Sequence, residues 1–164
     1  MSIKNVVVVG GGVLGSQIAY QTAYAGFHTT IYLRSEASVE RARPKVDRLH
    51  AIYVAELTAA KSNPGAPVSR GLVFNAADTA AVNYDELLAR AEKAYQELGY
   101  STDLAAAVND ADLIIEALAE DPKAKTAFYQ QLQPLLPEKT ILATNSSTLL
   151  PSMLADSTGR PEKV

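Results

Sequence analysis

The sequence predicts an α/β fold of the Rossmann type, a doubly wound and mostly parallel sheet with an inserted helical hairpin. Residues 6–9 are four consecutive valines that lead directly into Gly10-x-Gly12-x-x-Gly15. A helical apolar stripe and a second strand follow by residue 33. Later in the chain, two more apolar strands alternate with helical patterns. Continuous β-branched runs are typical of buried parallel strands, and the alternation is typical of βαβ units.

The glycine pattern lies where a dinucleotide pyrophosphate would need it, between a strand and a helix. Gly10 would permit a tight turn, Gly12 would let the backbone approach the phosphates, and Gly15 would let the helix pack close to the strand. The helix that begins at Val13 and Leu14 would offer free N–H groups and a partial positive charge to the anion. A glycine turn alone also occurs without phosphate, so the flanking strands carry this prediction.

Hydrophobic spacing and chain breakers predict the remaining elements in order. The first helix, over 13–25, ends at Gly26, and the second strand covers 29–33. Apolar residues three or four apart predict a long helix over 38–61, which Pro44 either kinks or begins. The breaker at 62–67 contains asparagine, glycine and two prolines. We then expect a loop over 68–82 with a short extended piece at 72–74, a helix over 84–98, a short strand over 100–102, a short helix over 104–108, a strand over 113–118, a helix over 122–136, a strand over 140–144 and a last helix over 149–155.

The chain length and composition fit one domain spanning residues 1–164, with a helical hairpin at about 38–98. The net charge of −3 and the pI of about 5.4 do not support binding to nucleic acid or to an anionic membrane. The absence of cysteine excludes disulfides and thiolate metal sites, and we predict no metal site. No apolar run approaches the length of a membrane span, and the cytoplasm is the expected compartment.

Open parallel sheets bind ligands beyond the carboxyl ends of their strands. Three polar groups of this sequence fall at such ends: the glycine turn, Glu120 with Lys125, and the segment 145–147, which reads Asn-Ser-Ser. We therefore expect them to converge on one ligand. Glu116 lies inside a strand, where a structural role is expected.

The stretch 111–120 (ADLIIEALAE), Lys125, and the stretch 143–147 (ATNSS) resemble the NAD-binding domain of L-3-hydroxyacyl-CoA dehydrogenases. The resemblance covers nearly all of the chain and includes the helical hairpin. It implies that the glycine turn holds the pyrophosphate, that Glu120 and Lys125 contact the cofactor, and that Ser147 lies by the nicotinamide and the substrate. It also implies that the hairpin helps to cover an acyl-CoA.

The chemistry of that family suits these residue types. A 3-hydroxyacyl-CoA loses a hydride from C3 to the nicotinamide and a proton from its hydroxyl to a base. Ser147 could hydrogen-bond the substrate oxygen, and Asn145 could orient its neighbours or the carboxamide. Lys125 could bond a ribose hydroxyl, with Glu120 as its ionic neighbour.

The family's general base is a histidine in a segment that would follow Pro161 shortly, whereas this sequence stops at Val164. The family's helical C-terminal domain, through which it dimerises, would also lie further on. We therefore expect a fragment that binds cofactor without turnover, from a longer homodimeric enzyme. His28 and His50 do not fall at the carboxyl end of a strand, so neither is expected to act as the base.

The cofactor prediction rests on the end of the second strand. An NAD-binding domain has an acid there for the ribose hydroxyls, and the family has an aspartate where this chain has Leu33. Arg34 and Ser35 follow, and they could bond a 2′-phosphate. We therefore predict NADP in preference to NAD; alternatively, Arg34 is solvated and Glu36 takes the role of the aspartate.

Two other functions remain open. The chain could belong to a dehydrogenase of another small 3-hydroxy compound, such as gulonate or carnitine, or to a non-catalytic dinucleotide sensor. Basic residues on the hairpin would favour an acyl-CoA substrate, because CoA carries phosphates. Arg41, Arg43, Lys45 and Arg48 are candidates for that role, or equally a solvated helix face.

Overall fold

The computed structural model describes residues 2–74 and 81–164. Within them, five parallel strands form one sheet in the order β3-β2-β1-β4-β5. The strand order reverses beside β1, so the end of β1 lies at the topological switch point, where doubly wound sheets bind ligands. This architecture confirms the predicted fold class. The strands are β1 (Asn5–Val9), β2 (His28–Tyr32), β3 (Gly99–Ser101), β4 (Leu113–Glu116) and β5 (Ile141–Thr144).

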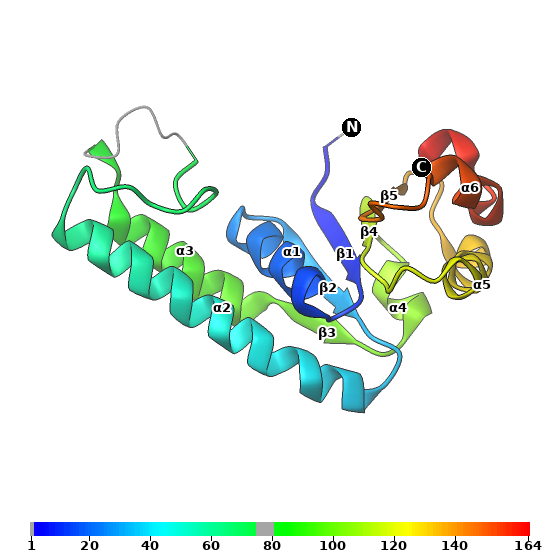
Figure 1. Ribbon diagram of the computed structural model, residues 1–164, viewed down its shortest axis with the longest axis horizontal. Helices are drawn as coiled ribbons and strands as arrows, with labels where there is room; N and C mark the ends of the chain where they lie inside the picture. Colours follow the sequence, from blue (N-terminus) through cyan, green and yellow to red (C-terminus); the bar gives the residue numbers. More distant parts are fainter. Residues whose placement is uncertain (1, 75–80) are drawn as a thin grey trace.

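The helices lie on both sides of the sheet (Figure 1). The two longest, α2 and α3, run side by side and pack against α1, while α5 and α6 lie at the β4–β5 end. The helices are α1 (Val13–Tyr24), α2 (Glu36–Ser62), α3 (Tyr84–Glu97), α4 (Leu104–Val108), α5 (Pro122–Leu132) and α6 (Pro151–Ala155), with single 3₁₀ turns at Gln133–Leu135, Asp156–Thr158 and Pro161–Lys163.

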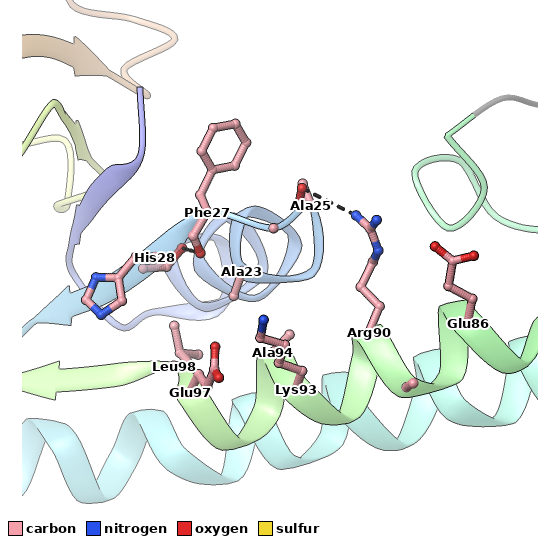
Figure 2. A pocket seen from close by; sticks show the side chains of 13 residues that line it. Ala23, Ala25, Phe27, His28, Glu86, Arg90, Lys93, Ala94, Glu97 and Leu98 are labelled. Atoms are coloured by element: carbon pink, nitrogen blue, oxygen red, sulfur yellow. Dashed lines mark hydrogen bonds between the residues drawn. The ribbon is translucent and has the colours of Figure 1, made fainter. Parts of the chain in front are cut away.

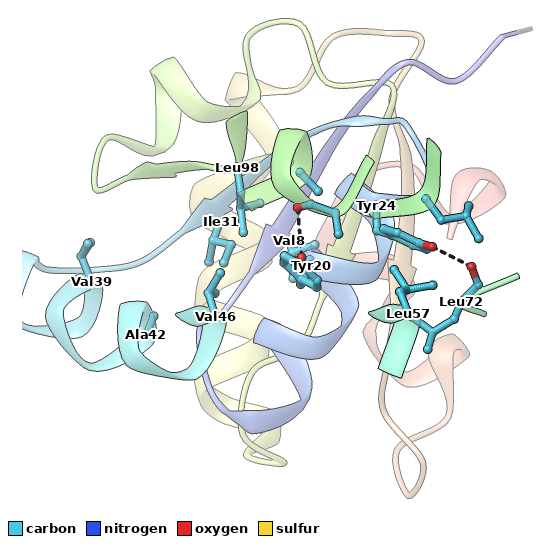
Figure 3. Close-up of a cluster of buried hydrophobic side chains, with 14 of the residues drawn as sticks. Val8, Tyr20, Tyr24, Ile31, Val39, Ala42, Val46, Leu57, Leu72 and Leu98 are labelled. Atoms are coloured by element: carbon cyan, nitrogen blue, oxygen red, sulfur yellow. Dashed lines mark hydrogen bonds between the residues drawn. The ribbon is translucent and has the colours of Figure 1, made fainter. Parts of the chain in front are cut away.

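Two hydrophobic cores follow from the alternation of side chains along β1. Val8 faces the core shared with α1, α2 and α3, and Val7 and Val9 face the core shared with α4, α5 and α6. The first core contains the fully buried Tyr20 and Tyr24 (Figure 3). Their hydroxyls donate to the carbonyls of Ala91, at 3.1 Å, and Leu72, at 2.6 Å, so both rings are buried with their polar ends satisfied.

Several element boundaries differ from those expected. Ser35 caps α2, because its Oγ accepts from the Ser38 amide at 3.3 Å, and the helix therefore begins at Glu36. The expectation that Pro44 could begin this helix is wrong, since Pro44 lies exposed inside a continuous helix. The strand expected over 113–118 ends at Glu116, whose carboxylate captures the Leu118 amide at 2.6 Å.

Other boundaries moved by a few residues. The helix expected over 122–136 ends at residue 132 and continues as a 3₁₀ turn, and the one expected over 149–155 begins at Pro151, where the ring fits the first helical position. Within the loop expected over 68–82, residues 75–80 lie outside the described residues, and the extended piece at 72–74 is reduced to an isolated bridge between Arg70 and Val73. None of the helices described is long and apolar enough to cross a bilayer.

Asp112 joins the start of β4 to the start of the chain. Its carboxylate accepts from the amides of Lys4 and Asn5, at 2.8 and 2.9 Å, and pairs with Lys139 at 2.8 Å. The Asn5 amide, the Lys139 ammonium and the Lys4 amide hold the pKa of Asp112 well below its usual range. A carboxylate with a depressed pKa in the folded state stabilises the fold above its unfolded pKa, and that stability is lost as the pH falls.

We therefore expect the free energy of unfolding to decrease as the pH falls from about 5 towards 2. Asp112→Asn should lower the melting temperature at pH 7 and flatten this pH dependence, which thermal unfolding by circular dichroism would measure. Asp156→Asn changes an exposed carboxylate whose side chain has no hydrogen bond among the residues described, and it serves as the control. An unchanged pH dependence in Asp112→Asn would contradict this account.

Candidate functional site

The glycine turn joins β1 to α1, and two of its positions exclude any side chain. Gly10 has φ of +109°, and a Cβ there would lie 2.7 Å from the Ala117 carbonyl oxygen. A Cβ on Gly15 would lie 2.2 Å from the Gly10 carbonyl oxygen. The turn is therefore packed tightly between α1 and the segment that follows β4.

The N-terminus of α1 is open, in contrast to the packed side of the turn. Gly12 is the N-cap and no side chain caps the helix. A Cβ on Gly12 would meet no atom within 4 Å. The side chains of Val13 and Leu14 are 68% and 50% exposed at this end. An uncapped helix N-terminus with open space before it fits the pyrophosphate of a dinucleotide.

A cavity of about 600 Å³ lies against this turn. One wall is the glycine turn, a second is the end of β2 with the first turns of α2, and a third is the segment after β4 with α5. Its lining is Val9, Gly10, Gly11, Gly12, Tyr32, Leu33, Arg34, Ser38, Arg41, Lys45, Leu118, Ala119, Ala124, Ala127, Phe128 and Gln131.

The α2 wall of this cavity is basic. Arg34, Arg41 and Lys45 line it, and no acidic side chain is among the lining residues. Arg41 donates to Ser38 Oγ at 2.8 Å, and Lys45 donates to the Arg41 carbonyl at 2.8 Å. The structure thus brings two of the four basic hairpin residues together with Arg34, two residues after β2, and these three charges favour an anionic group in the cavity.

The neighbouring residues take other roles. Leu33 is 6% exposed and packs against the turn at Gly11. A Cβ on Gly11 would lie 2.6 Å from Leu33 Cδ2. Ser35 Oγ caps α2 and lies 3.0 Å from Ser38 Oγ. Glu36 accepts from the Thr102 hydroxyl at 3.1 Å and is not among the residues that line the cavity. Arg43 lies over the Tyr100 ring at 4.3 Å, also away from the cavity.

A second polar cluster lies at the carboxyl ends of β4 and β5. Glu116 and Lys125 are both 1% exposed, and Lys125 Nζ lies 3.1 Å from Glu116 Oε2 and 3.5 Å from Glu120 Oε2. Glu116 Oε2 also accepts from the hydroxyls of Thr144 at 2.8 Å and Tyr129 at 3.3 Å. These contacts with Lys125, Tyr129 and Thr144 give Glu116 the structural role expected for it.

Glu120 connects this cluster to the segment 145–147. Its Oε2 accepts from the Ser146 hydroxyl at 2.7 Å, and its Oε1 accepts from the Ser147 amide at 3.2 Å. The Ser146 hydroxyl holds the pKa of Glu120 below its usual value, helped by the Ser147 amide and by Lys125. Neither the side chain of Asn145 nor the hydroxyl of Ser147 hydrogen-bonds to any residue described, and both residues are exposed.

The structure does not bring every expected residue to one cavity. Glu120, Lys125, Asn145 and Ser147 do not line the cavity at the glycine turn. They lie beyond β4 and β5, on the side of β1 opposite to β2. A dinucleotide that crossed the switch point from β2 to β5 would meet first the basic wall and then this cluster.

The two histidines lie elsewhere. His28 begins β2, at the amino ends of the parallel strands, and lines a separate cavity of about 530 Å³ between the α1–β2 turn and α3 (Figure 2). Side chains of both signs surround that cavity, including Arg90 and Glu97. His50 lies within α2, 2.9 Å from the Tyr20 hydroxyl and 3.2 Å from Glu92.

The family model of the 3-hydroxyacyl-CoA dehydrogenase NAD-binding domain matches residues 5–164. The chain belongs to this family. The glycine turn, the cavity and the cluster at the ends of β4 and β5 are thus features of a 3-hydroxyacyl-CoA dehydrogenase NAD-binding domain, and the resemblance seen in the sequence is confirmed.

Individual relatives agree with the family. The mitochondrial hydroxyacyl-coenzyme A dehydrogenase of Rattus norvegicus is 32% identical over 162 residues, which cover 98% of this chain and 44% of the relative. A diketoreductase structure, described as acting on dicarbonyl compounds, is 43% identical with a TM-score of 0.78, covering 99% of this chain and 48% of its own. FadB2 of M. tuberculosis is 26% identical with a TM-score of 0.77, covering 100% and 48%. The chain spans about half the length of each of these three relatives.

Residue spacing alone had not led us to expect that Arg41 and Lys45 of this 3-hydroxyacyl-CoA dehydrogenase domain line the same cavity as the glycine turn. Their spacing could have indicated this, because Ser38, Arg41 and Lys45 lie three and four residues apart and therefore share one face of the helix. Residue spacing also gave no reason to expect that Lys125 is buried between the carboxylates of Glu116 and Glu120. No local pattern signals that arrangement, because Glu116 and Lys125 come from a strand and a helix.

Proposed function

We propose that this chain forms the dinucleotide-binding half of a 3-hydroxyacyl-CoA dehydrogenase site and prefers NADP to NAD. The observation that carries this proposal is the open, uncapped N-terminus of α1, which faces a cavity with a basic wall and no acidic lining residue. The pyrophosphate would bind at Gly12, Val13 and Leu14, and the adenosine ribose would lie towards Arg34.

Arg34 supports the preference for NADP. A carboxylate at the end of β2 would bind the ribose hydroxyls of NAD and repel a 2′-phosphate. Here Leu33 is buried beneath the turn, and Arg34, Arg41 and Lys45 line the cavity instead. A guanidinium can hold a phosphate through two parallel hydrogen bonds. NADP carries a 2′-phosphate that can accept them at this position, whereas NAD does not.

The residues at the other end of the site would position the reacting groups. A bound nicotinamide cofactor supplies the hydride acceptor. Ser147, whose hydroxyl is free of other hydrogen bonds among the described residues, would bond the oxygen on C3 of an (S)-3-hydroxyacyl-CoA. Asn145 would orient the carboxamide of the cofactor or its neighbouring groups.

A titration of the purified chain with NADPH and NADH, followed by isothermal calorimetry, tests the cofactor proposal. We expect saturable binding of both, with a lower dissociation constant for NADPH. Absence of binding by either nucleotide would overturn the proposed function, and equal or tighter binding of NADH would overturn the preference alone.

We also expect residues 1–164 to bind cofactor without oxidising 3-hydroxybutyryl-CoA. Proton removal from the hydroxyl needs a base within hydrogen-bond reach. Neither His28 nor His50 lies beside the segment 145–147 in the described structure. Absorbance at 340 nm measures cofactor reduction, and turnover at the rate of a complete enzyme would contradict this prediction.

The diketoreductase supports a second candidate, the reduction of a small dicarbonyl compound that carries no CoA. Both reactions transfer a hydride at a carbon that bears oxygen, so the cofactor site does not distinguish them. An assay of a whole protein that contains this domain, with acetoacetyl-CoA and with a CoA-free diketo ester as competing substrates, separates the two candidates.

A further inference from the structure

The basic wall of the cavity at the glycine turn extends well beyond the end of β2. Arg34 lies two residues after β2, while Arg41 and Lys45 lie on successive turns of α2 and line the same cavity. The lining residues Ser38 and Lys45 are seven positions apart, which corresponds to about 10 Å along a helix axis. The wall therefore presents positive charge along a stretch of the cavity and not at a single point.

The three cations of this wall keep free hydrogen-bond donors. Arg34 is exposed and makes no hydrogen bond or ion pair within the described part of the chain. Among the described contacts, Arg41 uses one of its five N–H donors on Ser38 Oγ, and Lys45 uses one of its three on the Arg41 carbonyl. The remaining donors can bond a phosphate at more than one place along the wall.

The cavity has no acid that would select one ribose hydroxyl. In NAD-binding domains, the acid at the end of the second strand bonds a ribose hydroxyl, and a phosphate on the ring would meet its negative charge. Here Leu33 is buried at that position and Arg34 follows it. The 2′ and 3′ positions are neighbouring carbons of one ring, and a row of cations attracts a phosphate on either of them. Among the lining residues, no group would admit a 2′-phosphate and reject a 3′-phosphate.

The wall opposite the cations suits an adenine ring. Tyr32 and Phe128 line the cavity with their ring centroids 6.3 Å apart and their ring planes at 27°. Both residues are half-buried, and Ala124 and Ala127 extend the apolar surface beside them. A flat apolar surface packs against a purine whatever phosphate the attached ribose carries. The volume of about 600 Å³ is typical of a small-molecule site.

NADP and coenzyme A share the chemical group that these walls fit. Each contains an adenosine 5′-diphosphate with one further phosphate on the ribose, at the 2′ position in NADP and at the 3′ position in coenzyme A. We propose that the cavity also binds the 3′-phosphoadenosine end of coenzyme A, which competes there with NADP. This inference rests on the proposed function. It makes free coenzyme A an inhibitor that displaces the cofactor, at a place distinct from that of an acyl-CoA bound as substrate.

Calorimetric titration of residues 1–164 with coenzyme A, in the absence and presence of NADPH, tests this inference. We expect saturable binding, with an apparent dissociation constant for coenzyme A that rises in proportion to the concentration of NADPH. Dephospho-coenzyme A lacks only the 3′-phosphate and should bind at least about tenfold more weakly, because charge-assisted hydrogen bonds are lost. Adenosine 3′,5′-bisphosphate should also compete with NADPH, whereas pantetheine should not.

Two variants locate the competing ligand on the basic wall. Arg34→Ala and Arg41→Ala should each weaken the binding of coenzyme A about fivefold or more, and change that of dephospho-coenzyme A by less than about twofold. Arg48→Ala removes the same charge from a position of α2 that does not line the cavity, and it should bind both ligands as wild type does. All three arginines are exposed, and circular dichroism confirms that the variants fold.

Several results would overturn the competition. They are simultaneous binding of coenzyme A and NADPH, equal affinities for coenzyme A and dephospho-coenzyme A, and a loss of coenzyme A affinity in Arg48→Ala as large as that in Arg34→Ala. A chain that binds NADPH but not coenzyme A would also overturn it and would leave the proposed function intact. If the chain binds neither NADPH nor NADH, it is the proposed function that fails.

Discussion

Replacement of Gly15 by alanine is expected to abolish dinucleotide binding and to destabilise the fold. In an ordinary helix this change stabilises by about 1 kcal/mol. Here the new Cβ would lie 2.2 Å from the Gly10 carbonyl oxygen, so α1 must move away from the turn. Overpacking of this kind costs about 1–3 kcal/mol, and for a domain of this size we expect a melting temperature lower by about 2–12 °C. Because the N–H groups that would hold the pyrophosphate move with α1, the dissociation constant should rise more than about 30-fold.

Gly12→Ala is the matched control for this prediction. A Cβ on Gly12 meets no protein atom within 4 Å, so the melting temperature should stay within about 3 °C of wild type. The same Cβ would occupy space in front of the helix N-terminus, and binding should still weaken. Thermal unfolding and calorimetry separate the two effects. A Gly15→Ala variant with wild-type stability and affinity would contradict the packing described for the turn.

Replacement of Arg34 by alanine is expected to remove the preference for NADP. A charge-assisted hydrogen bond contributes about 1.5–3 kcal/mol, so the affinity for NADPH should fall by about 10- to 100-fold. The affinity for NADH should change by less than about threefold, because NADH has no 2′-phosphate. Isothermal calorimetry with both nucleotides measures the ratio.

Arg48→Ala removes the same charge from an exposed position of α2 that does not line the cavity, and it should leave both affinities unchanged. Arg41→Ala should give a smaller loss for NADPH than Arg34→Ala, since Arg41 already donates to Ser38. Equal losses of NADPH affinity in Arg34→Ala and Arg48→Ala would indicate a general charge effect. In that case the 2′-phosphate would not be held at Arg34.

The sequence was most informative where local chemistry dictates the backbone. The valine run, the glycine turn and the apolar spacing of the helices placed β1, α1 and the long helices α2 and α3 within a few residues. Asp103, Asp121 and Asn83 cap their helices, because a short polar side chain bonds the first free amides. Boundaries moved where a side chain competed for backbone groups, as Glu116 does at the end of β4.

For the candidate site as well, local sequence patterns predicted some features and not others. The glycine spacing between a strand and a helix predicted a pyrophosphate site, and the structure shows why glycine is needed there: φ is +109° at residue 10, and residue 15 lies close to the Gly10 carbonyl. The absence of an acid after β2 predicted the cofactor preference. The sequence also pointed to Lys125 and Glu120 as a pair, and the structure shows them paired, with Lys125 Nζ 3.5 Å from Glu120 Oε2.

Only the tertiary structure decided what those charged residues contact. Whether Arg41 faces the cavity at the glycine turn or solvent depends on how α2 crosses the end of β2, and whether Lys125 is buried depends on how α5 packs against β4. Contacts between segments far apart in the chain are set by packing of the whole domain, which residue spacing within one element does not encode. The sequence by itself therefore determined the fold and the glycine turn. The packing of helices against the sheet decided which charges line the cavity at that turn and which pair within the protein.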